Sequence, residues 1–532
     1  MFVLLTMLLM VQEIFGDSVV MAHRPTNPAE QATPQLTAQV IAQATETAEP
    51  VEIVTDQQVR PLPGQLDDVP VFNSNSPELV ADPGILLSTF PANGMASPEA
   101  HLDFVFDGRF DIFAHHVYKA ADYDEEEPVL LDSMYVGILV HNPGDEPVTL
   151  RILDGASYVS QPDAPFIPLP DFVPFSRNNP VYSGPGSRGM GDMLQGLRQD
   201  IFEPTVTIAP GESEMVLNHP INIRELVPPI NGRSTLMHVE SSGPVYVASL
   251  AQEVGIDENG EETPPSVDSW MSILKEGSLA GPRDRTPAPL PLEEGVQLIY
   301  GRVAGVSQGS QWRATLTDLD TAPGSEAATA LEASSETAEA VDEMTAAAVA
   351  DATEAVENFA ETALASRLTI PAVGEAFSYG ISLLYAGTMG TGQNQSAEML
   401  VRYPDTAYES HGNYGVRYSL TLPLYNSTNE EKTVTVALET AIKEDDLSEG
   451  GLRFFEPLPP QTFFRGPVQV RYSTDNGIPR IRNIHLVMRR GQQGTPLVEV
   501  TLAPQSSRTV DVDLLYPADS TPPQVLTVRT VE

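Results

Sequence analysis

Runs of apolar residues that alternate with polar ones recur along most of this sequence, and two of the runs repeat each other. Setting Asn142 on Asn426, an offset of 426 − 142 = 284 residues, aligns two complete hairpins without a gap. The apolar positions that coincide are Val136, Ile138 and Val140 in the first hairpin and Leu420, Leu422 and Leu424 in the second. Alternation with a period of two is the pattern of a β-strand with one buried face. The repeat therefore predicts two related β domains.

A second match supports the same interpretation. The segment TIAPGES (207–213) reappears as TLAPQSS (501–507), in both places as strand, Ala-Pro turn and strand. This order of elements is common in immunoglobulin-like sandwiches, and 47 prolines in 532 residues disfavour long helical bundles. We predict an all-β fold of two immunoglobulin-like β-sandwich domains, at 86–251 and 295–532, related by an internal duplication. Chance agreement between short β patterns is the alternative to duplication.

The N-terminal residues predict export. Residues 1–22 form a signal-like segment, whose apolar run Met1–Val11 is too short to span a bilayer. No Lys or Arg precedes this run, so a buried N-terminal strand is the alternative. No other stretch reaches the roughly 18 apolar residues that a membrane helix needs. We therefore expect no transmembrane span in the mature chain, which would lie in the periplasm, in the outer envelope or outside the cell.

The remaining segments differ from the sandwiches in composition. They are a disordered tether at 23–58, an extended docking segment at 59–85, a linker at 252–294 and, inside the second sandwich, a low-complexity insertion at 323–366. The insertion carries ten acidic residues and no Lys or Arg, which predicts a solvated loop. Within the linker, Trp270 and Leu274 share one face and Ser266 is placed as an N-cap, so one short helix is predicted there.

The charge balance restricts the partners and the chemistry. The chain carries 73 acidic and 29 basic residues, a formal charge of −44, which argues against binding to nucleic-acid phosphates. It has no cysteine, which excludes disulfides, thiolate metal sites and a cysteine nucleophile. No cofactor is identified. The acidic runs Asp122–Glu127 and Asp257–Glu262 leave surface calcium open beside ordinary solvated charge.

Two motifs are weighed against plain structural roles. Gly184–Gly189 matches G-x-G-x-x-G, but no strand-helix-strand unit surrounds it, so we interpret it as a turn. His115 and His116 are neighbours in a predicted strand, which places their side chains on opposite faces. A zinc or iron site that also uses His101 and His141 stays open, and the metal ligands are unknown.

The segment 401–418 is the predicted binding region. It concentrates tyrosines with a few polar groups, a composition that suits the recognition of a sugar or a peptide. The candidate ligand-binding residues are Tyr403, Asp405, Tyr408, His411 and Tyr414. Ordinary loop packing is the alternative for these side chains, and Tyr418 is expected in the core because it shares a face with Leu420. No catalytic residue is identified.

Long stretches of the sequence resemble a known family. They include RPLPGQLDDVPVFNSNSPELV, GRFDIFAHH, YSGPGSRGMGDMLQG, LVRYPDTAYESHGNYGVRYSLTLPLYN and YPADSTPPQVLTV. From about Arg60 to the C-terminus the chain resembles a family of exported cyanobacterial proteins known only as a domain of unknown function. The resemblance implies an envelope-associated protein and supplies no activity.

These observations favour a non-enzymatic role. We expect a structural, adhesive or polysaccharide-binding component of the cell envelope, whose partner is an envelope polysaccharide or another envelope protein. The alternative is a carbohydrate-active or metal-dependent enzyme on a β scaffold, so enzymatic activity stays open. A concave pocket in which His101, His115, Asp111 and a further acid converge would favour the enzyme.

Overall fold

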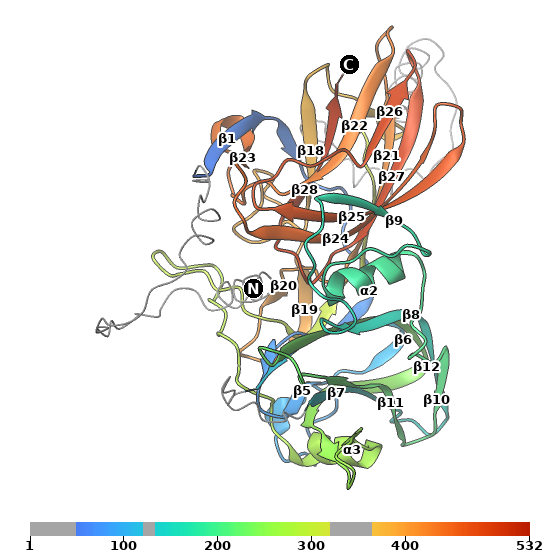
Figure 1. Cartoon of the computed structure of the whole chain (residues 1–532), viewed down its shortest axis with the longest axis vertical. Helices are drawn as coiled ribbons and strands as arrows, with labels where there is room; N and C mark the ends of the chain where they lie inside the picture. The colour runs from blue at the N-terminus through green and yellow to red at the C-terminus, as the bar shows by residue number, and fades with distance from the viewer. Residues whose placement is uncertain (1–48, 121–132, 320–363, 532) are drawn as a thin grey trace, which may run out of the picture.

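The computed structural model describes residues 49–120, 133–319 and 364–531. Strands dominate these residues, which contain two α-helices of ten residues each, so the predicted all-β class is confirmed. Figure 1 shows two β-sandwiches stacked along the long axis of the molecule, with helix α2 between them. The linker helix α3 covers the far side of the first sandwich.

The first sandwich packs two sheets that share strand β12. The larger sheet has the order β10-β8-β12-β6-β3-β15-β19-β20, with β4 beside β6, and the smaller sheet has the order β11-β7-β12-β5. The bounds are β3 Pro70–Ser74, β4 Leu79–Val80, β5 Gly84–Ser88, β6 Phe106–Lys119, β7 Met134–His141, β8 Val148–Val159, β10 Thr205–Ile208, β11 Ser213–Ile221, β12 Ile230–Glu253, β15 Ala304–Gln308, β19 Ala397–Arg402 and β20 Glu409–Ser410. The first half of β12 pairs with β6 and β8 and its second half pairs with β7.

The second sandwich also has two sheets, of orders β16-β21-β27-β24-β25-β9, with β17 beside β21, and β2-β18-β28-β22-β26. The bounds are β2 Gln58–Arg60, β9 Phe172–Phe175, β16 Gln311–Thr315, β17 Leu368–Thr369, β18 Ala376–Ile381, β21 Arg417–Tyr425, β22 Lys432–Glu439, β24 Thr462–Ser473, β25 Pro479–Arg489, β26 Val498–Leu502, β27 Ser507–Leu515 and β28 Gln524–Thr530. Leu420 and Leu422 of one sheet share a buried cluster with Val436 and Leu526 of the other. The two sheets therefore enclose one core.

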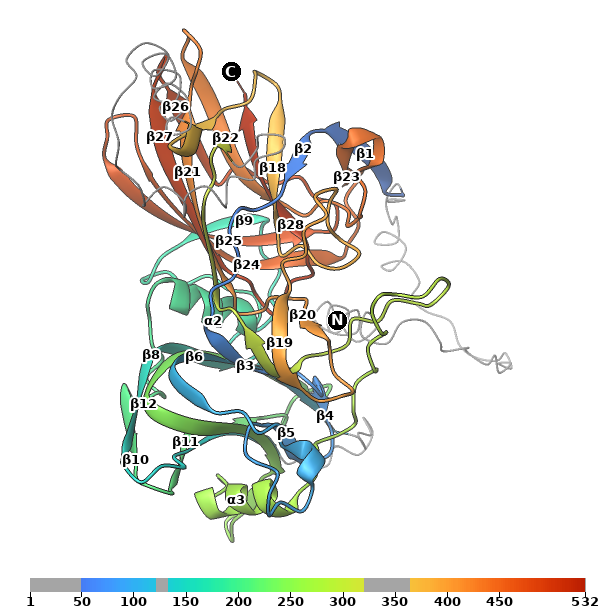
Figure 2. The ribbon, with the colours of Figure 1, turned by 180° about the vertical axis from the view of Figure 1, so that it is seen from behind.

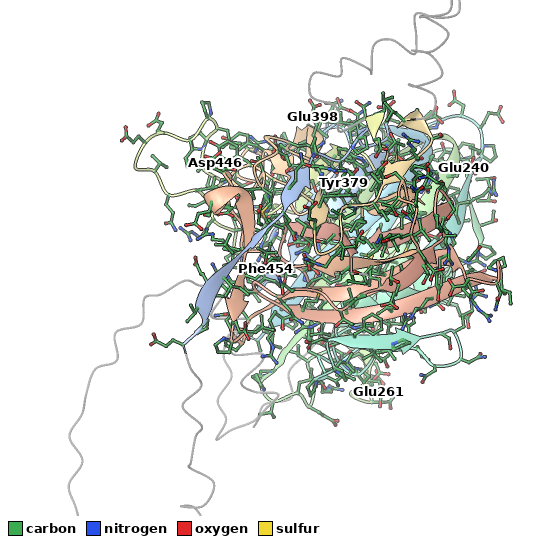
Figure 3. The ribbon with its side chains drawn as sticks, turned by 90° about the horizontal axis from the view of Figure 1, so that it is seen from above. Glu240, Glu261, Tyr379, Glu398, Asp446 and Phe454 are labelled. Atoms are coloured by element: carbon green, nitrogen blue, oxygen red, sulfur yellow. The ribbon has the colours of Figure 1, made fainter. Side chains whose placement is uncertain are left out.

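Smaller elements lie at the margins. The two-stranded pairs are β1 Val51–Asp56 with β23 Gly451–Glu456 and β13 Gly255–Ile256 with β14 Glu262–Thr263. The helices are α2 Pro185–Leu194, α3 Val267–Glu276 and the 3-10 turns η1 Pro98–Ala100 and η3 Ser448–Gly450. Seen from above in Figure 3, β1 runs along the edge of the second sandwich beside Phe454 of β23.

The two sandwiches have the same strand arrangement at their centre. In each, a short strand lies parallel to a longer one, β3 on β6 and β2 on β18. Antiparallel pairing then continues through β12, β8 and β10 in the first sandwich and through β28, β22 and β26 in the second. Parallel pairs depart from the antiparallel sheets of an immunoglobulin-like sandwich. The immunoglobulin-like detail of the prediction is therefore not confirmed.

The predicted hairpins close on equivalent buried asparagines. The amide of Asn142 donates to the carbonyl oxygens of Glu146 at 2.7 Å, Ile208 at 3.1 Å and Ala209 at 3.2 Å. The amide of Asn426 donates to those of Glu430 at 2.7 Å, Leu502 at 3.0 Å and Ala503 at 3.2 Å. Each asparagine therefore ties its own turn to a later turn of the same sandwich, the one between β10 and β11 in the first and the one between β26 and β27 in the second.

Strand pairing crosses the predicted domain boundaries. Strands β15, β19 and β20 fall within 295–532, yet they extend the larger sheet of the first sandwich beyond β3. Strand β9 falls within 86–251, yet it pairs with β25 in the second sandwich. The view from behind shows β19 in the same sheet as β3 (Figure 2), and β15 lies between the two strands. Alternation predicts that a segment is a strand but not which sheet edge it completes, so the boundaries fail at these segments.

The end of the predicted tether is structured. Residues 51–56 pair with β23 and residues 58–60 pair with β18, so the disordered interpretation is wrong for this part of 23–58. The docking segment, predicted as extended, supplies β3, β4 and the start of β5. The signal-like segment and nearly all of the insertion lie outside the described residues.

The linker helix forms as predicted. Helix α3 begins after Ser266, whose hydroxyl accepts a hydrogen bond from the Ser269 backbone N–H at 3.2 Å. Trp270 and Leu274 are fully buried against the smaller sheet of the first sandwich. Their cluster includes Leu139 of β7, so the outer face of this strand is covered as well as its inner face.

Candidate functional site

Tyr403 is a structural residue of the first sandwich. Its side chain is fully buried, its hydroxyl donates to the Ala100 carbonyl oxygen at 2.7 Å, and it accepts from the Ser88 backbone N–H at 3.0 Å. Burial raises its pKa. Because its polar atom is already used, Tyr403 is not accessible to a ligand, and loop packing, the alternative we weighed, describes it.

Asp405 forms an ion pair with an arginine of the linker. Arg283 donates from Nε at 2.8 Å and from Nη2 at 3.0 Å to the two carboxylate oxygens. This two-bond geometry fixes the guanidinium plane. The hydrogen bonds from Arg283 lower the pKa of Asp405. The pair joins the segment 401–414 to the linker, so Asp405 positions Arg283 beside the pocket described below.

Tyr408 and His411 line a small cavity with Tyr300. The His411 ring stacks on the Tyr300 ring with 5.0 Å between centroids, and burial lowers the pKa of His411 to about 4. The cavity holds about 20 Å³, enough for a single water molecule and too little for a sugar ring. Tyr408 is 40 % exposed and its ring lies under the Arg402 guanidinium.

Tyr414 lies between the two sandwiches. Its ring is 6.2 Å from Phe113 of the first sandwich and 6.2 Å from Tyr516 of the second, and its hydroxyl donates to the Ser520 carbonyl oxygen at 3.1 Å. Burial raises its pKa to about 12. The structure therefore does not bring the five predicted residues together into one site, and Tyr418 is in the core as expected.

A larger pocket lies next to them, where the linker passes the ends of β4, β6 and β12. It has a volume of about 450 Å³. The apolar part of its lining comes from Leu79, Val117, Ile230, Pro282 and Ile299. The charged part comes from Glu78, Lys119, Arg283, Asp284, Arg285 and Arg302. A concave apolar surface with a few convergent polar groups is the usual form of a ligand site.

A half-buried ion pair holds one wall of this pocket. Arg302 pairs with Glu78, whose other carboxylate oxygen lies 3.7 Å from Nε2 of His115. Burial opposes ionisation of Glu78, but Arg302 and His115 together lower its pKa below the ordinary value. Asp284 accepts from the Ser76 hydroxyl at 2.7 Å, and burial raises its pKa. These acids are therefore engaged within the protein.

The predicted histidines do not converge on this pocket or on a metal. His115 and His116 do point to different sides of β6, as predicted: His115 contacts Ser234 at 2.7 Å, and His116 contacts Ser74 at 3.0 Å. His101 contacts Ser88 instead, and His141 contacts Ser213. Within the described ranges no three His, Asp or Glu side chains are grouped as a metal site would require.

Asp111 belongs to a separate buried cluster. Nδ1 of His238 lies 2.6 Å from Asp154, its Nε2 lies 3.6 Å from Asp111, and Arg109 contacts Asp111 at 2.7 Å. Burial raises the pKa of Asp111, and although burial opposes protonation of His238, the two carboxylates raise the pKa of its imidazole. The cluster faces the junction between the sandwiches and not the pocket.

The G-x-G-x-x-G motif forms the start of α2, so its interpretation as a turn is wrong. The backbone N–H of Ser187, in the first turn of the helix, donates to Asp519 of the second sandwich at 3.1 Å. A Cβ atom on Gly186 would lie 2.7 Å from that carboxylate, so glycine permits the approach. The helix N-terminus is thus occupied by an acid of this chain, as its dipole favours.

The acidic run at 257–262 forms a tight turn between β13 and β14. The Asp257 carboxylate accepts from the backbone N–H groups of Asn259 at 2.8 Å and Glu261 at 2.9 Å. Both hydrogen bonds end on Oδ1 of Asp257, so they fix the turn. The run at 122–127 lies outside the described residues.

The charged residues of the pocket are not among the site residues predicted from sequence. Arg283, Asp284 and Arg285 lie within GPRDR, and two arginines within three residues are conspicuous in a chain with 25 arginines and 73 acids (29 − 4 lysines = 25). This was the available signal. Their position beside Lys119 and Arg302 depends on the path of the linker, which alternation does not encode.

The fold defines an all-β protein of two interlaced sandwiches. Compared with protein-family models, the chain matches at residues 57–335 and 344–530 and belongs to the family described as "Protein of unknown function (DUF3370)". No curated protein matches it. Among solved structures, procruciferin, an 11S globulin from Brassica napus, aligns at 7 % identity over 86 % of each chain with a TM-score of 0.08, a likeness too low to carry an argument. No helix among the described residues is long and apolar enough to cross a bilayer.

Proposed function

We propose that this protein is a non-enzymatic binding component of the cell envelope that holds an envelope polysaccharide in the pocket beside the linker. The observation that supports this proposal is the 450 Å³ pocket itself. Its volume lies within the range typical of sites for small organic ligands, so it accommodates a sugar unit of a longer polymer. The signal-like N-terminus, a prediction from sequence, supports export to the compartment where such polymers occur.

The proposed site is built for binding. Apolar side chains from β6, β12 and the linker supply a surface for the non-polar face of a sugar ring. Charged side chains at the same pocket supply hydrogen bonds that fix orientation. Two of the walls are held in place by ion pairs, Arg302 with Glu78 and Arg283 with Asp405, so the pocket exists before a ligand arrives.

The test is a pull-down of the purified chain on isolated cell-envelope glycans, after fractionation of the native cell with antibody detection. Ile230→Trp fills the pocket, because Ile230 lines it and is only partly buried. Ile481→Trp is the matched control, since Ile481 is 66 % exposed on β25 and lies outside the pocket. We expect binding by the wild type and the control and its loss in Ile230→Trp. Equal binding by all three, with unchanged melting temperatures, would contradict the proposal.

A further inference from the structure

The pocket is rich in positive charge in a strongly negative protein. Four of its twelve lining residues are basic and two are acidic, a formal balance of +2, in a chain whose total is −44. Over the whole chain, 29 of 532 residues are basic, which is about one in eighteen. In the lining of the pocket one residue in three is basic. The protein as a whole is negative, so a local excess of positive charge attracts anions to this pocket in particular.

Two of the four cations are already paired within the protein. Arg302 and Arg283 are paired with Glu78 and Asp405. Lys119 and Arg285 are exposed, and neither side chain makes a hydrogen bond, ion pair or ring contact to any residue of 49–120, 133–319 or 364–531. Within the described part of the chain, these two groups can turn to a ligand without breaking a bond.

The apolar surroundings of Lys119 and Arg285 strengthen the charge pairs that these two side chains can form with a ligand. Leu79, Val117 and Ile299 lie in the same lining, and apolar neighbours lower the local dielectric, so that a charge pair formed there is stronger than one in open water. The volume is also far larger than an inorganic anion needs. The fitting ligand is therefore an organic anion with an apolar face.

We infer that the pocket selects acidic sugars, in which Lys119 and Arg285 bind the anionic group of a sugar unit while the apolar lining contacts its ring. This rests on the proposed function and adds the chemical class of the ligand. A carboxylate and a sulfate ester share the required chemistry, because both present oxygens to which a guanidinium can donate two parallel hydrogen bonds. A neutral sugar leaves both cations without a partner.

The experiment measures the binding of three oligosaccharide probes to the full chain by calorimetry. The probes are an oligogalacturonate, a sulfated dextran oligomer and a neutral cello-oligosaccharide. The ionic strength is held near 0.15 M, where the Debye length of about 8 Å screens the distant acids of the surface. The variants are Lys119→Ala/Arg285→Ala, the charge-keeping Lys119→Arg/Arg285→Lys and the matched control Arg313→Ala/Arg480→Ala, which removes two exposed arginines outside the pocket.

We expect one or both acidic probes to bind the wild type, with roughly tenfold or greater loss in Lys119→Ala/Arg285→Ala, since each charge-assisted hydrogen bond removed weakens binding strongly. The control should bind as the wild type does, and the charge-keeping variant should recover most of the affinity. The acidic probe that binds more tightly distinguishes a carboxylate from a sulfate.

Three outcomes overturn the inference. Equal binding of the neutral and acidic probes, or an alanine double variant as tight as its control, would leave the polysaccharide-binding function standing and remove the selectivity for acidic sugars. No binding of any probe, together with no capture by isolated envelope glycans, would remove both. A circular dichroism melt of every variant separates loss of the site from loss of the fold.

Discussion

Asn142 and Asn426 are both fully buried, and each donates from its side-chain amide to three carbonyl oxygens at corresponding positions. The strands that lead into them differ. Every residue of β7 from Met134 to Val140 is buried, because α3 packs on the outer face, whereas β21 alternates strictly between buried and half-buried positions. The hydrogen bonds within a turn determine its conformation. The positions at which a strand tolerates polar residues depend on which other elements pack on its faces.

The largest effect is expected from charge placed inside the two strands. Ile138 and Leu422 occupy equivalent inward positions and are almost fully buried. Ile138→Asp and Leu422→Asp should each lower the free energy of unfolding by about 4 kcal/mol or more and abolish cooperative unfolding. Thermal melts followed by circular dichroism measure this.

Substitutions at neighbouring outward positions test the difference between β7 and β21. Leu139→Asp should be as damaging as Ile138→Asp, since Leu139 is buried under α3. Thr421→Asn should cost less than about 1 kcal/mol, because Thr421 is half-buried and an amide can still donate to Asp511, as the hydroxyl does at 2.7 Å. Tolerance of Leu139→Asp would show that α3 does not seal this face.

Removal of the buried amides tests what the two hairpins share. Asn142→Ala and Asn426→Ala each remove three hydrogen bonds from a buried amide to backbone carbonyl oxygens, so both should lower the free energy of unfolding by about 2–4 kcal/mol. The two values, from urea unfolding, should agree within about 0.5 kcal/mol. A large effect at one site alone would break the equivalence of the two turns.

His485 in the second sandwich and His238 in the first should affect stability in opposite senses as the pH changes. Burial, and then Arg465, lower the pKa of His485 in the second sandwich to about 3, and neither ring nitrogen has a hydrogen-bond partner among the described residues. Its stability contribution is therefore full above the ordinary histidine pKa and is lost on acidification. His485→Leu should recover about 2 kcal/mol of the stability lost between pH 7 and 5.

The contribution of His238, in the first sandwich, to stability has the opposite pH dependence. Asp111 and Asp154 raise its pKa, so its contribution is present below the ordinary histidine pKa and is lost as the pH rises through the raised value. His238→Gln should therefore flatten the loss of stability on the alkaline side and leave the acid side unchanged. Urea midpoints across pH 5 to 9 separate the two variants, and identical profiles would refute the assignment.

The smallest effect is expected from deleting residues 323–366. The backbone N–H of Asp318 donates to the Arg367 carbonyl oxygen at 2.8 Å, so the flanks are already joined. Shortening a loop whose ends are held together changes its closure entropy little, and the melting temperature should move by only a few degrees. Loss of the cooperative transition would mean that the segment contributes to the core.

Much of the fold was predictable because it depends on local sequence patterns. The alternation around Leu422, the cap at Ser266 and the apolar β7 all led to the structure observed, since each depends on residues close in sequence. The helix at the glycine motif was missed, because it is held by Asp519, more than 300 residues away. The candidate site failed for the same reason: Tyr403 looks exposed in sequence but is buried by strands from the other end of the chain.

The exchange of strands has a consequence for how the chain reaches its native state. The larger sheet of the first sandwich is completed only when β19 is available, at residues 397–402, and a sheet of the second sandwich begins with β2, at residues 58–60. Neither half can therefore finish folding while the C-terminal third is still being synthesised. Contacts so distant in sequence slow folding and leave unpaired strand edges exposed for longer. A chain with this topology is expected to refold slowly from denaturant and to depend on a chaperone that holds it until its last strand has emerged.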